Sequence, residues 1–148
     1  MNISRLHVNE VNKIIPIFNE YRVYFGEQSD TASAESFLYE NLSSDNAVIF
    51  IAEDKDDVIG FIQLYTMLSS MKMSELLIIN DLYLTAKARG QRIGEKLMHQ
   101  AFKYGKENGY ETIYLETEQS NIGGNRLYTK LGMQIDDEHN YYSKSLQN

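Results

Sequence analysis

Apolar and polar residues alternate along the chain in patterns that predict strands in some segments and helices in others. The run 76–84 is apolar except for Asn80 and Asp81, which is typical of a strand covered on both faces. Residues 93–108 repeat apolar side chains at the three- and four-residue spacing of an amphipathic helix. The other patterns predict strands at 1–7, 47–52, 58–68, 112–117 and from 133 through 142, and helices at 14–25, 33–42 and 121–131.

The predicted order is strand, two helices, three strands, helix, strand, helix, strand. It favours an α/β (α+β) fold with a mixed central sheet of about six to seven strands and about four helices. The alternation in the second half implies that strands 76–84 and 112–117 pair in parallel through a right-handed crossover. The chain contains no internal repeat, low-complexity tract or flexible linker, so residues 1–148 are expected to form one domain.

The composition narrows the classes of function. A formal charge of −7 opposes binding to nucleic acid and favours a cationic small molecule. The absence of cysteine excludes a disulfide, a thiolate nucleophile and a cysteine-type zinc site, and the three histidines lack metal-ligand spacing, so no metal is expected. There is no membrane-length apolar run and no secretory signal pattern at the start, so we expect a cytoplasmic protein with no membrane partner.

Asn80 and Asp81 are polar residues inside an otherwise apolar strand. Burying either side chain without a hydrogen bond would cost about 1 to 3 kcal/mol, so each needs a partner or serves a site. The sequence is equally consistent with a satisfied pair at a strand distortion and with a functional pair.

A cluster of cations follows this strand although the chain is acidic. Its members are Lys87, Arg89, Arg92 and Lys96. They surround Gly90 and Gly94 at the predicted start of a helix, where free N–H groups and the helix dipole attract an anion such as a pyrophosphate. A solvated helix face is the alternative explanation. The pattern is neither a P-loop nor a dinucleotide fingerprint, because it lacks Gly-Lys-Ser/Thr and a third glycine.

Two short motifs are more specific. The first begins in the strand predicted at 76–84 and consists of Asp81, Leu82, Tyr83, Leu84, Arg89, Gly90, Gln91, Arg92, Ile93 and Gly94. The second consists of Asn121, Gly124, Leu127, Tyr128, Gly132 and Met133. They resemble the acyl-CoA motif and the closing pattern of the GNAT N-acetyltransferase superfamily, in particular of its small single-domain bacterial members. In the first motif Arg92 replaces the usual glycine, and a helical φ with an outward side chain would accommodate it.

The resemblance implies an acetyl-CoA-dependent N-acetyltransferase that moves the acetyl group directly to an amine within a ternary complex. It places backbone groups of 82–84 along the pantetheine, residues 89–94 on the pyrophosphate and Asn121 on the coenzyme. It also implies that Tyr128 donates a proton or a hydrogen bond to the departing thiolate. At the level of the family, a homodimer is possible.

The resemblance leaves the general base open. An alkyl ammonium has a pKa of about 10.4 and must lose a proton before it attacks. Some polyamine-acetylating relatives have a glutamate where this chain has Asn80, whose amide cannot accept that proton. Asp81, Glu116 and Glu118 are the carboxylates near the strand ends, and Glu118 or a chain of water molecules is preferred.

The acceptor is expected to be a small-molecule primary amine, such as a polyamine, an aminoglycoside or an amino-acid-like compound. The predicted substrate-binding residues are Tyr24, Tyr65, Asn80 and Asp81, because aromatic rings and carboxylates attract cations. Core packing explains the tyrosines equally well. The alternatives are a protein N-terminal or lysine acetyltransferase and a module that binds acyl-CoA without efficient transfer.

Overall fold

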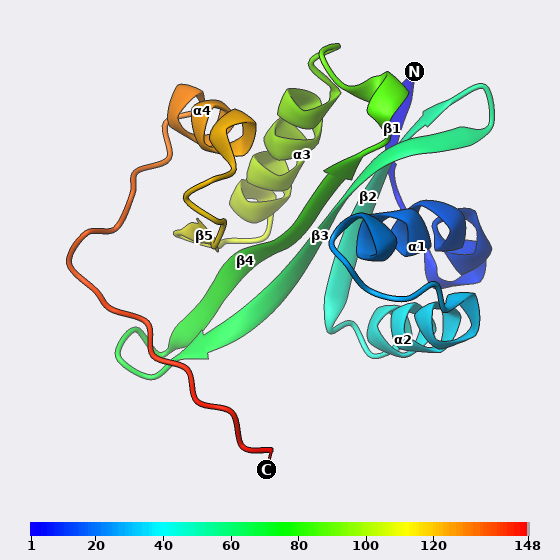
Figure 1. The fold of residues 1–148 in the computed structure, drawn as a ribbon. Coiled ribbons are helices and arrows are strands. Elements are labelled where there is room, and N and C mark those ends of the chain that lie inside the picture. The colour runs from blue at the N-terminus through cyan, green and yellow to red at the C-terminus, as the bar shows by residue number, and fades with distance from the viewer. Residues whose placement is uncertain (148) are drawn as a thin grey trace. The chain divides into compact units, whose positions relative to one another are not determined.

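A five-stranded sheet is the centre of the computed structural model, which describes residues 1–147 (Figure 1). The strands are β1 (Asn2–Arg5), β2 (Ala47–Asp54), β3 (Asp57–Ser69), β4 (Ser74–Leu84) and β5 (Ile113–Leu115). They lie in the order β1-β2-β3-β4-β5, with antiparallel pairing from β1 to β4 and parallel pairing between β4 and β5. The predicted α/β class and the parallel pair are therefore confirmed.

Helices are interspersed with these strands along the described chain. They are α1 (Ile15–Tyr24), α2 (Thr31–Ser43), α3 (Ile93–Glu107) and α4 (Ile122–Lys130), with short 3-10 helices η1 (Val8–Lys13) and η2 (Ala86–Ala88). Helix α2 begins two residues earlier than the apolar pattern predicts. The reason is its cap, since the Asp30 carboxylate accepts the backbone N–H of Ser33 at 3.0 Å.

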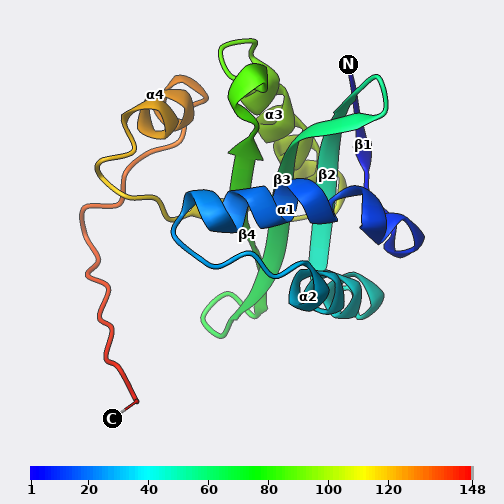
Figure 2. The same ribbon diagram turned by 45° about the vertical axis from the view of Figure 1, so that its right-hand side comes forward.

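The described chain divides into two compact units. Residues 1–116 hold the whole sheet with α1, α2 and α3, and residues 117–147 hold α4 and the segment after it. Within the first unit, α3 lies on one face of the sheet, while α1 and α2 lie on the other (Figures 1 and 2). The single domain predicted for 1–148 stays a prediction, and residue 148 lies outside the described residues.

The face beneath α1 and α2 forms the larger hydrophobic core. Its buried members are Leu6, Val11, Ile14, Ile17, Phe18, Ala34, Leu38, Ile49, Ile51, Phe61 and Tyr83. On the opposite face, the apolar stripe of α3 buries Ile93, Leu97, Met98 and Ala101. Because α1 belongs to the core, its later residues are held next to the middle of β4, where the polar pair lies.

The polar pair marks a distortion in β4. Gln63 pairs with Asp81 and Leu64 pairs with Ile79, so Asn80 is an extra residue on β4, as in a β-bulge. The parallel ladder to β5 covers only Leu77 to Ile79. Past the bulge, the described residues of β4 therefore have a paired edge toward β3 and an unpaired edge on the other side.

The predicted strand count was too high. The segment 133–142 was predicted to contain one or two strands, yet the described residues from 117 to 147 contain none. Its large apolar side chains are exposed, namely those of Ile135, Tyr141 and Tyr142. A β-forming composition needs a neighbouring strand that supplies hydrogen bonds and side-chain contacts, and the second unit contains no such strand among its described residues.

Candidate functional site

The unpaired edge of β4 is the first part of the candidate site. From Asn80 to Leu84 this edge has no strand partner on the β5 side among the described residues. Free N–H and C=O groups on such an edge can bind an extended ligand that carries amide groups, as an added strand would. The predicted backbone contacts of Leu82, Tyr83 and Leu84 with a pantetheine arm fit this edge.

The loop from Thr85 to Arg92 connects this edge to α3. Gly90 has φ +78° and Arg92 has φ +63°, so both adopt the left-handed backbone region. The helical φ that would accommodate Arg92 is therefore not the one it adopts. The reason is positional, because Arg92 is the N-cap of α3 and the chain must turn there before the helix begins. A left-handed conformation costs a residue with a Cβ about 1 to 2 kcal/mol.

Arg92→Gly is expected to raise the free energy of unfolding by up to about 1 kcal/mol, because relief of the left-handed strain exceeds the added entropy of an unfolded glycine. Urea denaturation measures the change, provided that the dependence of the unfolding free energy on urea concentration is the same in both proteins. Lys96→Gly, inside α3, is the matched control and should lower stability by about 1 kcal/mol. A loss of stability in both variants would contradict the argument.

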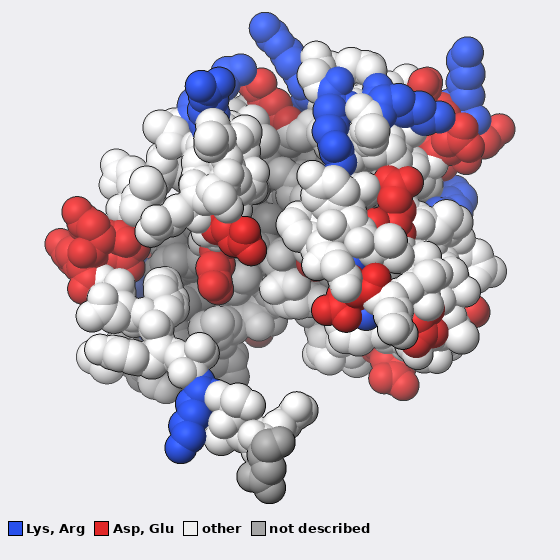
Figure 3. All heavy atoms as spheres, in the orientation of Figure 1, with Lys and Arg blue, Asp and Glu red and all other residues white. Residues whose placement is uncertain are grey.

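The start of α3 is suited to an anion. Its N-cap makes no side-chain capping bond, so the first N–H groups of the helix remain available. Gly94 is buried in the first turn, and the side chains of Lys87, Arg92 and Lys96 are exposed. Figure 3 shows basic side chains projecting from this end of the first unit. Backbone donors and surrounding cations together fit a diphosphate.

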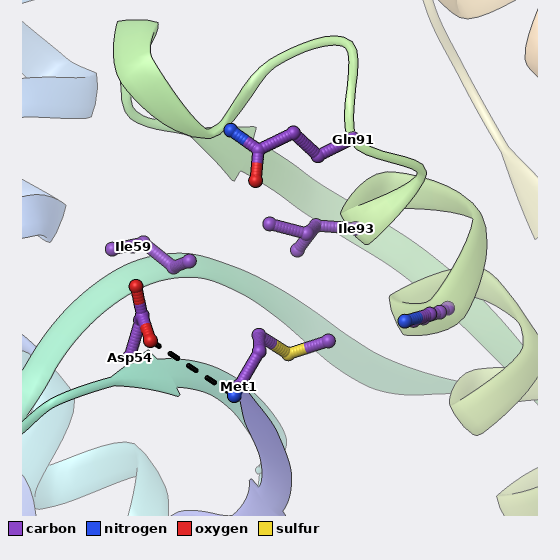
Figure 4. A pocket seen from close by; sticks show the side chains of 6 residues that line it. Met1, Asp54, Ile59, Gln91 and Ile93 are labelled. Carbon is purple, nitrogen blue, oxygen red and sulfur yellow. Dashed lines mark ion pairs between the residues drawn. The ribbon is translucent and has the colours of Figure 1, made fainter.

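A shallow hollow of about 260 Å³ lies behind this loop (Figure 4). It is lined by Met1, Asp54, Ile59, Gln91, Ile93 and Lys96. The side chain of Gln91 donates to the carbonyl of Lys87 at 2.7 Å. This bond connects two residues of the loop, so the side chain of Gln91 stabilises the loop backbone.

The side chain of Arg89 points toward the end of β4 and α1. Its Nε and Nη2 donate to the carbonyl of Leu84 at 3.3 and 3.1 Å. Its guanidinium carbon lies 5.2 Å from the centre of the Tyr24 ring and 5.7 Å from that of Tyr83. The charge of Arg89 therefore lies against α1 and the end of β4, in contact with two aromatic faces.

Asp81 is the buried carboxylate of the site, with 8% of its surface exposed. Its Oδ1 accepts the Tyr21 hydroxyl at 2.7 Å, and its Oδ2 accepts the amides of Gln63 at 2.7 Å and Asn80 at 3.0 Å. Asp81 is thus satisfied at a strand distortion, which was one of the two explanations left open for the polar pair, while Asn80 is exposed. The bond from Tyr21 places Asp81 beside α1.

Gln63 is a site residue that sequence reasoning missed. It is 1% exposed, and its Oε1 has no hydrogen-bond partner within the described chain. The available signal was its polarity in the apolar run from Ile59 to Leu64, the same signal that identified Asn80 and Asp81.

Asp81→Leu is expected to lower the free energy of unfolding by about 2 to 5 kcal/mol, because the buried donors of Tyr21 and Gln63 lose their acceptor. Asp81→Asn should lower the free energy of unfolding by a smaller amount, since an amide oxygen still accepts one of these hydrogen bonds. Chemical denaturation measures both. Asp57→Leu, at an exposed position on β3, should change stability by less than about 0.5 kcal/mol. Equal stability of Asp81→Leu and the unmodified protein would refute the role of the cluster.

Two tyrosines near the cluster keep their protons. Burial raises the pKa of Tyr65 to about 12, and the negative charge of Asp81 adds to the effect while Gln63 opposes it. Burial likewise raises the pKa of Tyr83 to about 12, and its hydrogen bond to Glu20 at 2.8 Å adds to this while Arg89 opposes it. Both hydroxyls are therefore donors at neutral pH. Tyr24, at 62% exposure, supplies an accessible aromatic face.

The second unit contains the remaining predicted residues. Asn121 caps α4, because its Oδ1 accepts the Gly124 N–H at 3.2 Å. Tyr128 is half-buried on α4, and burial raises the pKa of its hydroxyl, so it remains a proton donor above neutral pH. Glu118 is exposed, and its carbonyl accepts the Asn121 N–H at 3.0 Å. Within this unit the structure brings Glu118 and Asn121 together at the start of α4.

Two further properties concern the described residues 1–147. No group of three or more histidine, aspartate or glutamate side chains in this range is placed to hold a metal ion. No helix in it has both the length and the apolar character needed to cross a membrane.

Comparison with known proteins connects this geometry to a family. The model of the acetyltransferase (GNAT) family matches residues 14–133. An uncharacterized N-acetyltransferase of Bacillus subtilis strain 168, YhfO, is 36% identical over 96% of this chain and 95% of its own. The solved structure of a probable acetyltransferase is 27% identical, with TM-score 0.91 over 100% of this chain and 99% of its own. The solved structure of an aminoglycoside acetyltransferase from an uncultured soil metagenomic sample is 19% identical, with TM-score 0.86 over 99% of this chain and 96% of its own.

Proposed function

This chain belongs to the acetyltransferase (GNAT) family and is an acetyl-CoA-dependent N-acetyltransferase, and we propose that its acceptor is the primary amine of a small cationic molecule. The observation that carries the proposal is the buried carboxylate of Asp81 beside the aromatic residues of α1. Negative charge and aromatic faces attract an ammonium group. The aminoglycoside acetyltransferase with the same fold acts on molecules of this kind.

Residues of the first unit would hold the coenzyme through backbone groups. The edge from Leu82 to Leu84 would bind the amide-bearing arm, and the loop from Arg89 to Gly94 would bind the diphosphate. The contact of Asn121 with the coenzyme stays a prediction from the sequence resemblance. The left-handed backbone at Gly90 and Arg92 supports this assignment, because it turns the loop into the start of α3.

The thioester supplies an activated acetyl group, whose carbonyl carbon bonds to the amine nitrogen while the carbon–sulfur bond breaks. The hydroxyl of Tyr128 gives its proton to the departing sulfur and regains one from solvent, while the nitrogen loses its second proton to solvent as the amide forms. The proton lost by the acceptor ammonium goes to Glu118 or to a chain of water molecules, because the amide of Asn80 is not a base. Asp81 stays a charge partner, since three donors already bind its oxygens.

The experiment measures free thiol release from acetyl-CoA with a panel of polyamines, aminoglycosides, amino acids and short peptides. Each amine is paired with its alcohol analogue of equal length as a control. Turnover with one class of cationic small molecule supports the proposal, and Asp81→Asn should raise the KM of that amine by about 10-fold or more.

Other outcomes would identify the alternatives. Turnover confined to peptides would indicate a protein N-terminal or lysine acetyltransferase. Tight CoA binding without turnover on any amine would indicate a module that binds acyl-CoA without efficient transfer. A homodimer and a cytoplasmic location stay predictions, and sedimentation equilibrium of the purified chain tests the first.

A further inference from the structure

Helix α1 is attached to β4 by two side-chain hydrogen bonds. The Tyr21 hydroxyl donates to Asp81 Oδ1 at 2.7 Å, and the Tyr83 hydroxyl donates to Glu20 Oε2 at 2.8 Å. Asp81 and Tyr83 are alternate residues of one strand and project to the same face of the sheet. These two bonds hold the middle of α1 against β4, and neither involves the loop that would bind the coenzyme.

A third attachment comes from that loop. The guanidinium of Arg89 lies between the Leu84 carbonyl and the rings of Tyr24 and Tyr83. Tyr24 is the last residue of α1 and is mostly exposed, whereas Tyr83 is buried. Arg89 is therefore the residue that connects the coenzyme loop to the exposed, acceptor-facing end of α1.

The position of Arg89 depends on the backbone beside it. Arg89 itself is extended, and Gly90 next to it has φ +78°. A ligand held by the N–H groups of this loop restricts the same backbone, and it thereby restricts the guanidinium. A side chain that bound the phosphates would direct its charge toward the start of α3. Both hydrogen bonds of Arg89 instead go to the carbonyl of Leu84, at the end of β4.

We propose that Arg89 is a positioning residue that transmits coenzyme occupancy of the loop to the acceptor-facing end of α1, through its contacts with Tyr24, Tyr83 and the Leu84 carbonyl. The inference rests on the proposed coenzyme site but not on the identity of the acceptor. Because coupling between two sites is reciprocal, a bound acceptor tightens coenzyme binding by the same factor.

Hydrogen–deuterium exchange of the full chain, with and without saturating CoA, tests the coupling. In the unmodified protein, CoA should slow exchange in residues 85–95 and also, by about threefold or more, in residues 20–26 at the end of α1. Arg89→Met should keep the protection of 85–95 and lose that of 20–26. Tyr24→Leu removes the other side of the contact and should give the same result.

Lys87→Met is the matched control, because it removes a cation of the same loop whose side chain is exposed. It should keep the CoA-dependent protection of 20–26. Protection of 85–95 without protection of 20–26 in the unmodified protein would overturn the inference, as would unchanged protection of 20–26 in Arg89→Met. If CoA protects neither segment and calorimetry detects no binding, the proposed coenzyme site itself fails.

Discussion

Gly94→Trp is expected to abolish coenzyme binding, raising the Kd for CoA by about 100-fold or more. Gly94 is buried in the first turn of α3, where the N–H groups of the helix start would meet the diphosphate. An indole at this position would cover those donors and keep the phosphates away from the backbone. Isothermal titration calorimetry with CoA measures the loss.

A graded series separates this effect from misfolding. Gly94→Ala adds a single methyl group and should weaken binding less than the indole does, and circular dichroism should show native helix content in both variants. If the Gly94→Trp variant folds correctly and binds CoA as tightly as the unmodified protein, the diphosphate does not lie at the start of α3.

Tyr128→Phe is expected to lower kcat for acetyl transfer by about 100-fold or more, the usual contribution of a positioned general acid, while the Kd for CoA changes by less than about threefold. The hydroxyl is lost but the half-buried ring remains on α4, so the helix should keep its packing. Steady-state kinetics with the best acceptor, together with calorimetry for CoA, separates the two effects.

The protonation of the Tyr128 hydroxyl predicts how activity depends on pH. Burial raises its pKa, so the proton-donating form persists to higher pH than for a free tyrosine. The activity of the unmodified enzyme should therefore not fall through loss of this proton below about pH 10. Tyr142→Phe, at an exposed tyrosine, is the control and should leave kcat unchanged. Equal loss of CoA binding and of kcat in Tyr128→Phe would contradict the role as general acid.

The glycine- and cation-bearing loop before α3 was predictable because its signals are local. Glycines at 90 and 94, cations around them and an amphipathic helix directly after them lie within one short stretch. The same holds for the strand 76–84 and for the helix that carries Tyr128, because each was predicted from the apolar pattern of its own residues. Local backbone preference and periodicity suffice for such elements, because each depends on residues only a few positions apart.

The polar cluster around Asp81 was only partly predictable. Asn80 and Asp81 were recognised as polar residues in an apolar strand, but only Asp81 is buried, and its partners Gln63 and Tyr21 lie on another strand and on a helix. Pairing between β3 and β4 sets the bulge that places Asp81 opposite Gln63. A register of this kind is decided by all the cross-strand contacts together, and so no single segment contains it.

The amino-acid sequence alone therefore determined the family, the loop of glycines and cations before α3 and the order of the elements as far as α4, because each depends on a short, contiguous pattern. Tertiary structure decided the left-handed turn at Arg92, the direction of Arg89 toward Tyr24 and the absence of strands in the described residues from 117 to 147. The physical reason is the same in each case. A side chain's direction and a strand's existence depend on which distant groups lie beside them, and only the folded chain brings those groups into contact.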